Sequence, residues 1–219
     1  CSIGAAHWIH AIRYNMNLTV LLHDNEIYGL TKMQTSPTSP RGTRSNTTPG
    51  GSVLEPLDPL SVTLGVANVS FVAQAADWAP QLLYDVVRQA FHHRGFSFVR
   101  VLQRCPNYLP HLFDEAMRNP SRLLILEDER GIPPGSAVRA AYPAHLRHAP
   151  DDLERARSLA SRRDVFPIGV LYRDDSVPCY EDLCAAPAVG VEVIGEALER
   201  QLDRFAVRAA RGGEPGERT

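Results

Sequence analysis

The stretch that decides the fold is residues 21–40, LLHDNEIYGLTKMQTSPTSP. The apolar run Leu18–Leu22 leads into it and predicts a buried β-strand, which ends at the polar residues 23–25. Ligands of open parallel sheets lie beyond the carboxyl ends of the strands, so a polar cluster there, followed by Gly29, predicts a cofactor site. Asn25 offers a neutral amide oxygen that suits Mg²⁺, and Gly29 lets main-chain N–H groups approach a phosphate closely.

The run that begins at Asn25 carries a family resemblance. An Asp-Asn pair alone fills ordinary turns, but the whole run follows a strand and a histidine-containing helix, and it resembles the thiamine-diphosphate loop of the 2-oxoacid:ferredoxin oxidoreductase beta subunit. The resemblance extends over nearly the whole chain, down to the segments IGVLYRD and VPCYEDL. The matching loop residues are Asn25, Ile27, Tyr28, Gly29, Leu30, Thr31, Lys32, Gln34, Ser36, Pro37 and Thr38.

The resemblance implies a fold and a cofactor site. The fold is α/β, a thiamine-diphosphate-binding parallel sheet flanked by helices, with a C-terminal α+β extension. The Asn25 side chain and the main-chain carbonyl of Ile27 would bind Mg²⁺, and the amides of Gly29 and Leu30 would bind the diphosphate. The acidic Mg²⁺ ligand of the family lies in a Gly-Asp-Gly triplet, which by the family's spacing would fall just before Cys1, so we expect an N-terminally truncated chain.

Two residues of the loop are candidates for substrate binding. Lys32 would lie beside the diphosphate and an anionic 2-oxoacid, where a cation would hold a carboxylate or a coenzyme A phosphate, although an exposed loop lysine is most often only solvated. Thr31 has two interpretations, since its hydroxyl would either contact substrate or close the turn.

A second candidate site is Cys105, which follows the predicted strand Phe96–Leu102. A single cysteine in this position is commonly a buried thiol. The resemblance implies instead that Cys105 supplies the fourth thiolate of a 4Fe–4S cluster in the intact subunit, with the other three in the family's N-terminal portion. Cys179 and Cys184 have C-x4-C spacing without a second pair, so we interpret them as structural or incidental.

The composition excludes several classes of function. With 219 residues, 44% hydrophobic, the chain is long enough for one α/β domain and an extension, which we divide at residues 1–107 and 108–219. A formal net charge of −2 and a pI near 6.5 give no basic field for nucleic acid and no polybasic membrane patch. No long apolar segment and no signal pattern appear, so we expect a cytoplasmic protein.

Periodicity predicts the remaining elements. The helix at residues 3–15 places His7 and His10 on one stripe, and we expect them to line the core or a cleft because a metal site needs further ligands. The Ser/Thr/Pro/Gly-rich residues 35–59 have the composition of a flexible linker, but we favour a loop that covers the site, with Arg41 and Arg44 near an anion. We expect further helices at residues 59–66, 78–91, 111–118, 151–163 and 194–207, strands at 69–72, 96–102, 122–126 and 166–172, and a disordered tail at 211–219. The helix at residues 78–91 should dock on a sheet through an apolar stripe that ends at Phe91.

Taken together, the resemblance implies the beta subunit of an enzyme that oxidatively decarboxylates a 2-oxoacid of the pyruvate or 2-oxoglutarate type to acyl-CoA and CO₂. Its partners would be the alpha subunit, which binds the cofactor's aminopyrimidine, together with coenzyme A and ferredoxin. Two alternatives belong to other classes, namely a ferredoxin-independent thiamine-diphosphate decarboxylase or synthase, and a non-catalytic scaffold.

Overall fold

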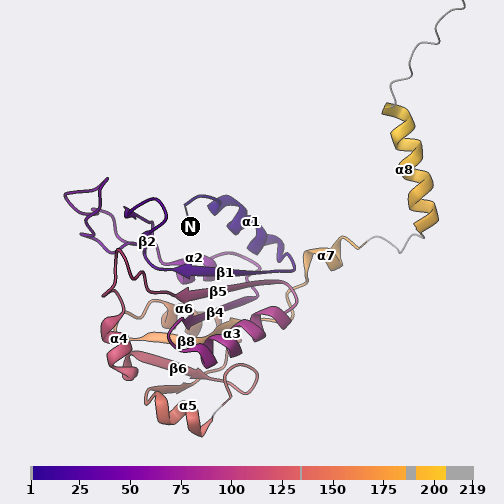
Figure 1. Ribbon diagram of the computed structural model, residues 1–219. Coiled ribbons are helices and arrows are strands. Elements are labelled where there is room, and N and C mark those ends of the chain that lie inside the picture. The colour runs from indigo at the N-terminus through magenta and orange to yellow at the C-terminus, as the bar shows by residue number, and fades with distance from the viewer. Residues whose placement is uncertain (1, 134, 186–190, 206–219) are drawn as a thin grey trace, which may run out of the picture. The chain divides into compact units, whose positions relative to one another are not determined.

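The computed structural model describes residues 2–133, 135–185 and 191–205 (Figure 1). The chain divides into two compact units, Cys1–Leu183 and Cys184–Thr219, and each is considered by itself. The predicted tail at residues 211–219 and the end of the last predicted helix lie outside the described residues. The second unit contributes one described helix, α8 (Val191–Phe205).

The first unit is built on a six-stranded sheet whose strands lie in the order β1-β5-β4-β8-β6-β7. Strands β1, β5 and β4 are parallel to one another, β8, β6 and β7 are parallel to one another, and β4 and β8 are antiparallel. The sheet therefore consists of two parallel halves that run in opposite directions, and the carboxyl ends of β1, β5 and β4 share one edge. The strands are β1 (Leu18–Asp24), β4 (Phe71–Ala76), β5 (Phe96–Leu102), β6 (Leu123–Glu127), β7 (His145–Arg147) and β8 (Phe166–Arg173).

Helices cover both faces of this sheet (Figure 1). Side chains alternate along each strand, so that Phe71 packs on the α3 face and Val72 on the face covered by α1, α2 and α6. Helix α3 contributes Leu82, Val86 and Ala90 to its core. The helices of this unit are α1 (Ala5–Tyr14), α2 (Pro59–Leu64), α3 (Pro80–His92), α4 (Asp114–Arg118), α5 (Ser136–Ala141), α6 (Leu153–Ala160) and α7 (Tyr180–Leu183), with a 3₁₀ turn at Pro120–Arg122.

The predicted fold class is confirmed, and so are most of the predicted elements. The strand predicted at residues 69–72 runs on to Ala76, and the helix predicted at residues 151–163 is the shorter α6, in which Ala156, Leu159 and Ala160 are buried. Helix α5, strand β7 and the small antiparallel pair β2 (Ile27–Tyr28) and β3 (Gln34–Thr35) were not predicted. β8 comes from the predicted extension and pairs with β4, so residues on both sides of position 107 share one sheet.

Three predictions about burial were wrong. Strand β1 lies at the edge of the sheet, so Leu18 and Leu21 remain 37% and 41% exposed and the strand is not buried. Phe91 is 75% exposed, because the core face of α3 is narrower than the apolar stripe in its sequence. His7 and His10 are exposed, since α1 packs on the sheet through Ile12 and its neighbours.

Among the described residues, no helix has both the length and the apolar character needed to cross a membrane.

Candidate functional site

The predicted site residues gather where the first parallel half of the sheet ends. Asn25 follows β1, and Cys105 lies just beyond the end of β5. The two strand ends are tied together, because the Gln103 N–H donates to the Asp24 carbonyl at 3.1 Å. The sheet thus brings the loop after β1 and the segment after β5 to one edge, as expected for the ligand crevice of a parallel sheet.

The turn Asn25–Ile27 is an Asx turn. Asn25 Oδ1 accepts a hydrogen bond from the Ile27 N–H at 3.2 Å, and Glu26 between them has a left-handed φ of 56°. A carboxamide oxygen has two lone pairs, so Asn25 Oδ1 retains one after this bond. The turn places the two candidate Mg²⁺ ligands, the Asn25 oxygen and the Ile27 main chain, within two residues of each other, and this donor set fits a hard cation.

The loop between β2 and β3 has the form of an anion cradle. The Lys32 N–H donates to the Gly29 carbonyl and the Met33 N–H to the Tyr28 carbonyl, each at 3.1 Å, with left-handed φ values of 70° and 75° at Lys32 and Met33. Within the described residues, no hydrogen bond uses the main-chain N–H groups of Gly29, Leu30 or Thr31. Three successive free N–H groups on an exposed turn are the donors that a diphosphate requires.

Three consecutive side chains of this loop are exposed to solvent. Leu30 is 99% exposed, and Thr31 and Lys32 are exposed as well. Among the described residues, the Thr31 hydroxyl makes no hydrogen bond, and both interpretations of its role stay predictions. Both polar side chains are accordingly available to a ligand.

The long loop at residues 36–58 is folded and lies beside the cradle. Asn46 Nδ2 donates to the Lys32 carbonyl at 3.1 Å, and within the loop the Gly42 N–H donates to the Ser52 carbonyl at 2.7 Å. Arg41 forms an exposed ion pair with Glu55 at 3.0 Å. This placement is compatible with a covering loop, a role that stays a prediction.

Gly29 brings the two candidate sites together. A Cβ at Gly29 would lie 3.8 Å from Cys105 Sγ and 3.8 Å from the Tyr108 ring, so the cradle lies beside the segment that carries Cys105. Cys105 is a free thiol and is 7% exposed. Among the described residues, no three His, Cys, Asp or Glu side chains lie close enough together to hold a metal ion. Cys105 therefore offers a single thiolate, and the described residues do not form an iron–sulfur cluster site.

Behind the Asx turn lies a buried ionic group that sequence analysis missed. Asp24 is 4% exposed, and its Oδ2 accepts from Arg100 Nε at 2.8 Å and lies 2.7 Å from Arg100 Nη2. Glu26 Oε1 is 3.5 Å from the same guanidinium, and burial together with the Asp24 charge raises the pKa of Glu26 to about 7. The signal for this group was an arginine inside the apolar strand FSFVRVL, since a charge there requires a buried partner.

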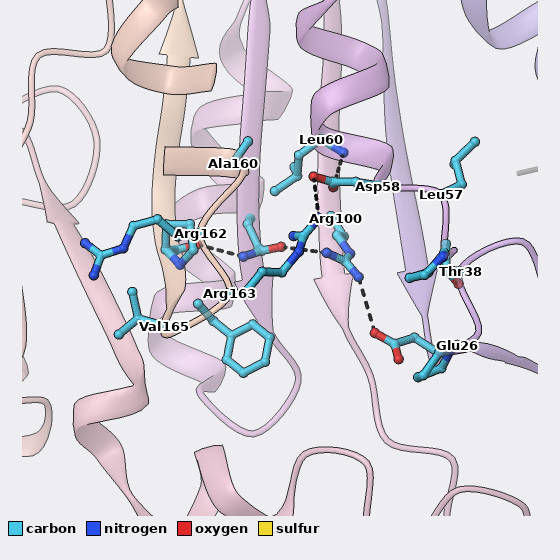
Figure 2. Close-up of a pocket in the computed structure, with 15 residues that line it drawn as sticks. Glu26, Thr38, Leu57, Asp58, Leu60, Arg100, Ala160, Arg162, Arg163 and Val165 are labelled. Atoms are coloured by element: carbon cyan, nitrogen blue, oxygen red, sulfur yellow. Dashed lines mark hydrogen bonds and ion pairs between the residues drawn. The ribbon is translucent and has the colours of Figure 1, made fainter. Parts of the chain in front are cut away.

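A cavity of about 250 Å³ opens on this group from the face that carries α2 and α6. Arg100 points across it toward Glu26, and Asp58 and Arg163 lie on another wall (Figure 2). Asp58 caps α2 by accepting from the Leu60 N–H at 3.1 Å, and its other oxygen is 3.7 Å from Arg163. Four of the charges that line the cavity are therefore paired with one another, and the fifth, Arg162, pairs with Asp164 outside the lining.

Comparison with known proteins supports the resemblance. Residues 2–101 match the family described as thiamine pyrophosphate enzyme, C-terminal TPP binding domain. The chain is 42% identical over 132 residues to the 2-oxoglutarate oxidoreductase subunit KorB of Mycobacterium tuberculosis, and 30% identical over 180 residues to the 2-oxoacid:ferredoxin oxidoreductase subunit beta of Sulfolobus sp. The chain is therefore similar, over 82% of its length, to a beta subunit of the 2-oxoacid:ferredoxin oxidoreductases.

A solved structure of such an oxidoreductase shares the fold. It is the 2-oxoglutarate:ferredoxin oxidoreductase from Magnetococcus marinus, determined with 2-oxoglutarate, coenzyme A and succinyl-CoA bound, and it matches with a TM-score of 0.68 at 28% identity. The match covers 94% of this chain and 64% of that one. The alignments with the Mycobacterium and Sulfolobus proteins cover 60% and 82% of this chain and 35% and 56% of those proteins, so the chain spans only part of the length of its relatives.

Proposed function

We propose that this chain is the thiamine-diphosphate-binding part of a beta subunit whose enzyme oxidatively decarboxylates a 2-oxoacid to acyl-CoA and CO₂ and passes the electrons to ferredoxin. The observation that carries the proposal is the closeness of Gly29 to Cys105, since a Cβ added at Gly29 would lie 3.8 Å from the thiol sulfur. The phosphate cradle therefore lies beside the cysteine of the second candidate site. A family in which a thiamine cofactor must exchange electrons with a redox group has reason to keep these two segments close together.

In this proposal the loop residues have separate tasks. Asn25 and the Ile27 carbonyl bind Mg²⁺, and the free N–H groups of Gly29 and Leu30 donate to the diphosphate. Bound thiamine diphosphate supplies the electron sink for loss of CO₂. The chain's own residues fix the diphosphate end of the cofactor, and the alpha subunit binds its aminopyrimidine.

The exposed side chains beyond the cradle serve the substrate. Lys32 makes no ion pair within the described residues, and it lies in the loop that would hold the diphosphate. A free ammonium there stabilises a 2-oxoacid carboxylate, of the pyruvate or 2-oxoglutarate type, or a coenzyme A phosphate, with the Thr31 hydroxyl as a second donor.

Cys105 belongs to the redox part of the proposal. We assign it as one thiolate of a 4Fe–4S cluster in the intact subunit, with the remaining thiolates supplied by residues other than those described here. The assignment rests on its position after β5 and its closeness to the cradle. Free thiols at Cys105, Cys179 and Cys184 agree with a reducing compartment, and we place the subunit in the cytoplasm.

The extension is also part of the proposal. We retain residues 1–107 as the cofactor-binding portion and residues 108–219 as the beta-subunit extension, which completes the sheet through β6, β7 and β8. The division is one of function, because the first compact unit runs through to Leu183.

The test uses the full-length gene product, expressed anaerobically together with an alpha-type partner subunit. We expect reduction of ferredoxin, or of a viologen dye, that depends on a 2-oxoacid and on coenzyme A. Asn25→Ala abolishes it because the Mg²⁺ ligand is lost. Asn119→Ala is the matched control, since this exposed asparagine accepts a hydrogen bond from the Ser121 N–H and belongs to another part of the fold.

Two further variants separate the parts of the proposal. Lys32→Met should raise the KM for the 2-oxoacid or for coenzyme A without loss of thiamine diphosphate, and Cys105→Ser should remove iron from the complex. A complex that binds thiamine diphosphate, contains no iron and never reduces ferredoxin would favour the decarboxylase or synthase. A complex that binds no thiamine diphosphate would favour the scaffold.

A further inference from the structure

The turn that carries the proposed Mg²⁺ ligands is held from behind by Asp24. This carboxylate uses both oxygens. Oδ1 accepts from the Glu26 N–H at 3.3 Å and from Thr38 Oγ1 at 2.6 Å, and Oδ2 accepts from Arg100. Asp24 and Thr38 stand on either side of the cradle in sequence, so one buried carboxylate closes the whole loop.

Arg100 in turn fixes Asp24. It comes from β5, where it is paired in register with Leu22 of β1 and Gln74 of β4, and its side chain is 13% exposed. Asp24, Arg100 and Gln74 lie on the same face of the sheet, and the guanidinium meets Asp24 through two nitrogens while Nη1 lies 3.5 Å from Gln74 Oε1. A planar fork on a carboxylate sets an orientation that a single ammonium does not set.

A buried ion pair of this kind needs a reason other than stability. The free energy needed to remove two charges from water is about as large as the free energy gained from their attraction. Apolar side chains of the same size would therefore stabilise the sheet at least as well. Here every partner of the pair belongs to the cofactor loop, residues 25–38, or to a neighbouring strand. Glu26 lies within the Asx turn, Thr38 ends the loop, and Gln74 is on β4.

We infer that Arg100 is a positioning residue for the metal site: through Asp24, it holds the Asn25 oxygen and the Ile27 carbonyl in the arrangement that Mg²⁺ requires. This inference rests on the proposed function. Partners that orient metal ligands typically change metal affinity by about 10- to 100-fold when they are removed. The effect should therefore appear in Mg²⁺ affinity before it appears in the fold.

The first experiment measures binding, in the full-length complex with its partner subunit. Calorimetric titration of Mg²⁺ at saturating thiamine diphosphate should show about 10- to 100-fold weaker binding for Arg100→Met than for wild type, with Arg100→Lys in between. Arg157→Met is the matched control, because Arg157 also ties two elements together, donating to the Leu64 carbonyl at 3.0 Å, but it joins α6 to α2 and has no contact with the cofactor loop. It should bind Mg²⁺ as wild type does.

The second variant separates positioning from folding. Arg100→Met alone leaves Asp24 buried without its partner and lowers thermal stability. In Asp24→Asn/Arg100→Met neither charge remains, so stability should return toward wild type while Mg²⁺ affinity stays low. A merely structural role predicts the opposite, that affinity recovers together with stability.

The outcomes are distinct. If the wild-type complex does not bind thiamine diphosphate with Mg²⁺, the proposed function falls and this inference falls with it. If wild type binds and Arg100→Met binds Mg²⁺ equally well, or if the double variant recovers full affinity, only the inference is overturned.

Discussion

Gly95 offers a sharp test of the packing at the amino end of β5, opposite to the strand end that carries the candidate site. Its φ is +125°, and an added Cβ would lie 2.5 Å from Asn15 Oδ1 and 2.7 Å from Asn15 Nδ2. Asn15 is 1% exposed, and its side chain accepts from the Phe96 N–H at 2.7 Å and from Ser70 Oγ at 2.6 Å. It also donates to the Val177 carbonyl at 3.0 Å, so it joins α1, β4, β5 and the segment before α7.

Gly95→Ala therefore acts in two ways. The left-handed backbone costs about 1–2 kcal/mol in any L residue, and displacement of Asn15 leaves the buried Phe96 N–H without its acceptor, which costs about 1–3 kcal/mol more. Loss of the Ser70 bond adds to this, so we expect the free energy of unfolding to fall by about 3–5 kcal/mol. Gly42→Ala is the control, since Gly42 has a φ of +86° but open space within 4 Å of the added Cβ. It should cost only the backbone term, about 1–2 kcal/mol.

Urea unfolding followed by circular dichroism measures both variants. The decisive comparison repeats Gly95→Ala in an Asn15→Ala background, where the added methyl has room and its extra cost over Gly42→Ala should shrink to less than about 1 kcal/mol. A Gly95→Ala variant no less stable than Gly42→Ala, or an extra cost that persists after Asn15 is removed, would refute the reasoning.

Three further predictions concern acid, the core and the cysteines. Burial lowers the pKa of His93 and His148, so both rings stay neutral in the folded state while the unfolded chain takes up protons, and the free energy of unfolding should fall as the pH drops below about 6.5. Denaturant midpoints measured from about pH 7.5 to pH 5 should change less with pH in the variant with both histidines replaced by glutamine. An unchanged pH dependence in that variant would show that other groups dominate. Leu82→Ala should lose about 2–5 kcal/mol of unfolding free energy and Phe91→Ala less than about 0.5, because only Leu82 is buried; equal losses would contradict the packing of α3. Iodoacetamide should label the exposed Cys184 in the native protein and the two buried described cysteines only in denaturant, as peptide mapping with a Cys184→Ser control would show.

The cofactor loop could be predicted because its information is local. Asn25, Ile27 and Gly29 lie within five residues after a predicted strand, and the structure places them in one turn and the loop that follows it. Asparagine is a residue type that forms Asx turns of the kind seen here. Local information also predicted the strand that precedes the loop and helix α3, whose periodicity is strong over its whole length. Such patterns predict that an element exists, not where it lies in the sheet.

The rest depended on contacts between distant residues. No periodicity shows that β8 inserts between β4 and β6 and runs against β4. Nor does any show that β1 pairs only with β5 among the described strands, which places it at the sheet edge and leaves Leu21 exposed. The prediction that Phe91 is buried was wrong for a related reason. The apolar stripe of a helix marks the residues that are able to face a core, but the width of the interface between α3 and the sheet decides which of them do. The pairing of Asp24 with Arg100 joins residues 76 positions apart, and the sequence shows only that a charge interrupts an apolar strand.

That interruption bears on how the site handles charge. The proposed ligand is a diphosphate, and the chain places a carboxylate, Asp24, one residue before Asn25, the proposed Mg²⁺ ligand. An unpaired carboxylate there would repel the phosphates through a low-dielectric interior, where charges interact more strongly than in water. Arg100 cancels that charge at 2.7 Å, so the loop can offer neutral donors to the anion. On this argument Arg100→Lys should weaken diphosphate binding less than Arg100→Met does, because lysine keeps the charge. Mg²⁺ affinity should fall in both variants, because it depends on the geometry of the guanidinium. Equal losses of diphosphate affinity in the two variants would show that Arg100 does not act by cancelling the charge of Asp24.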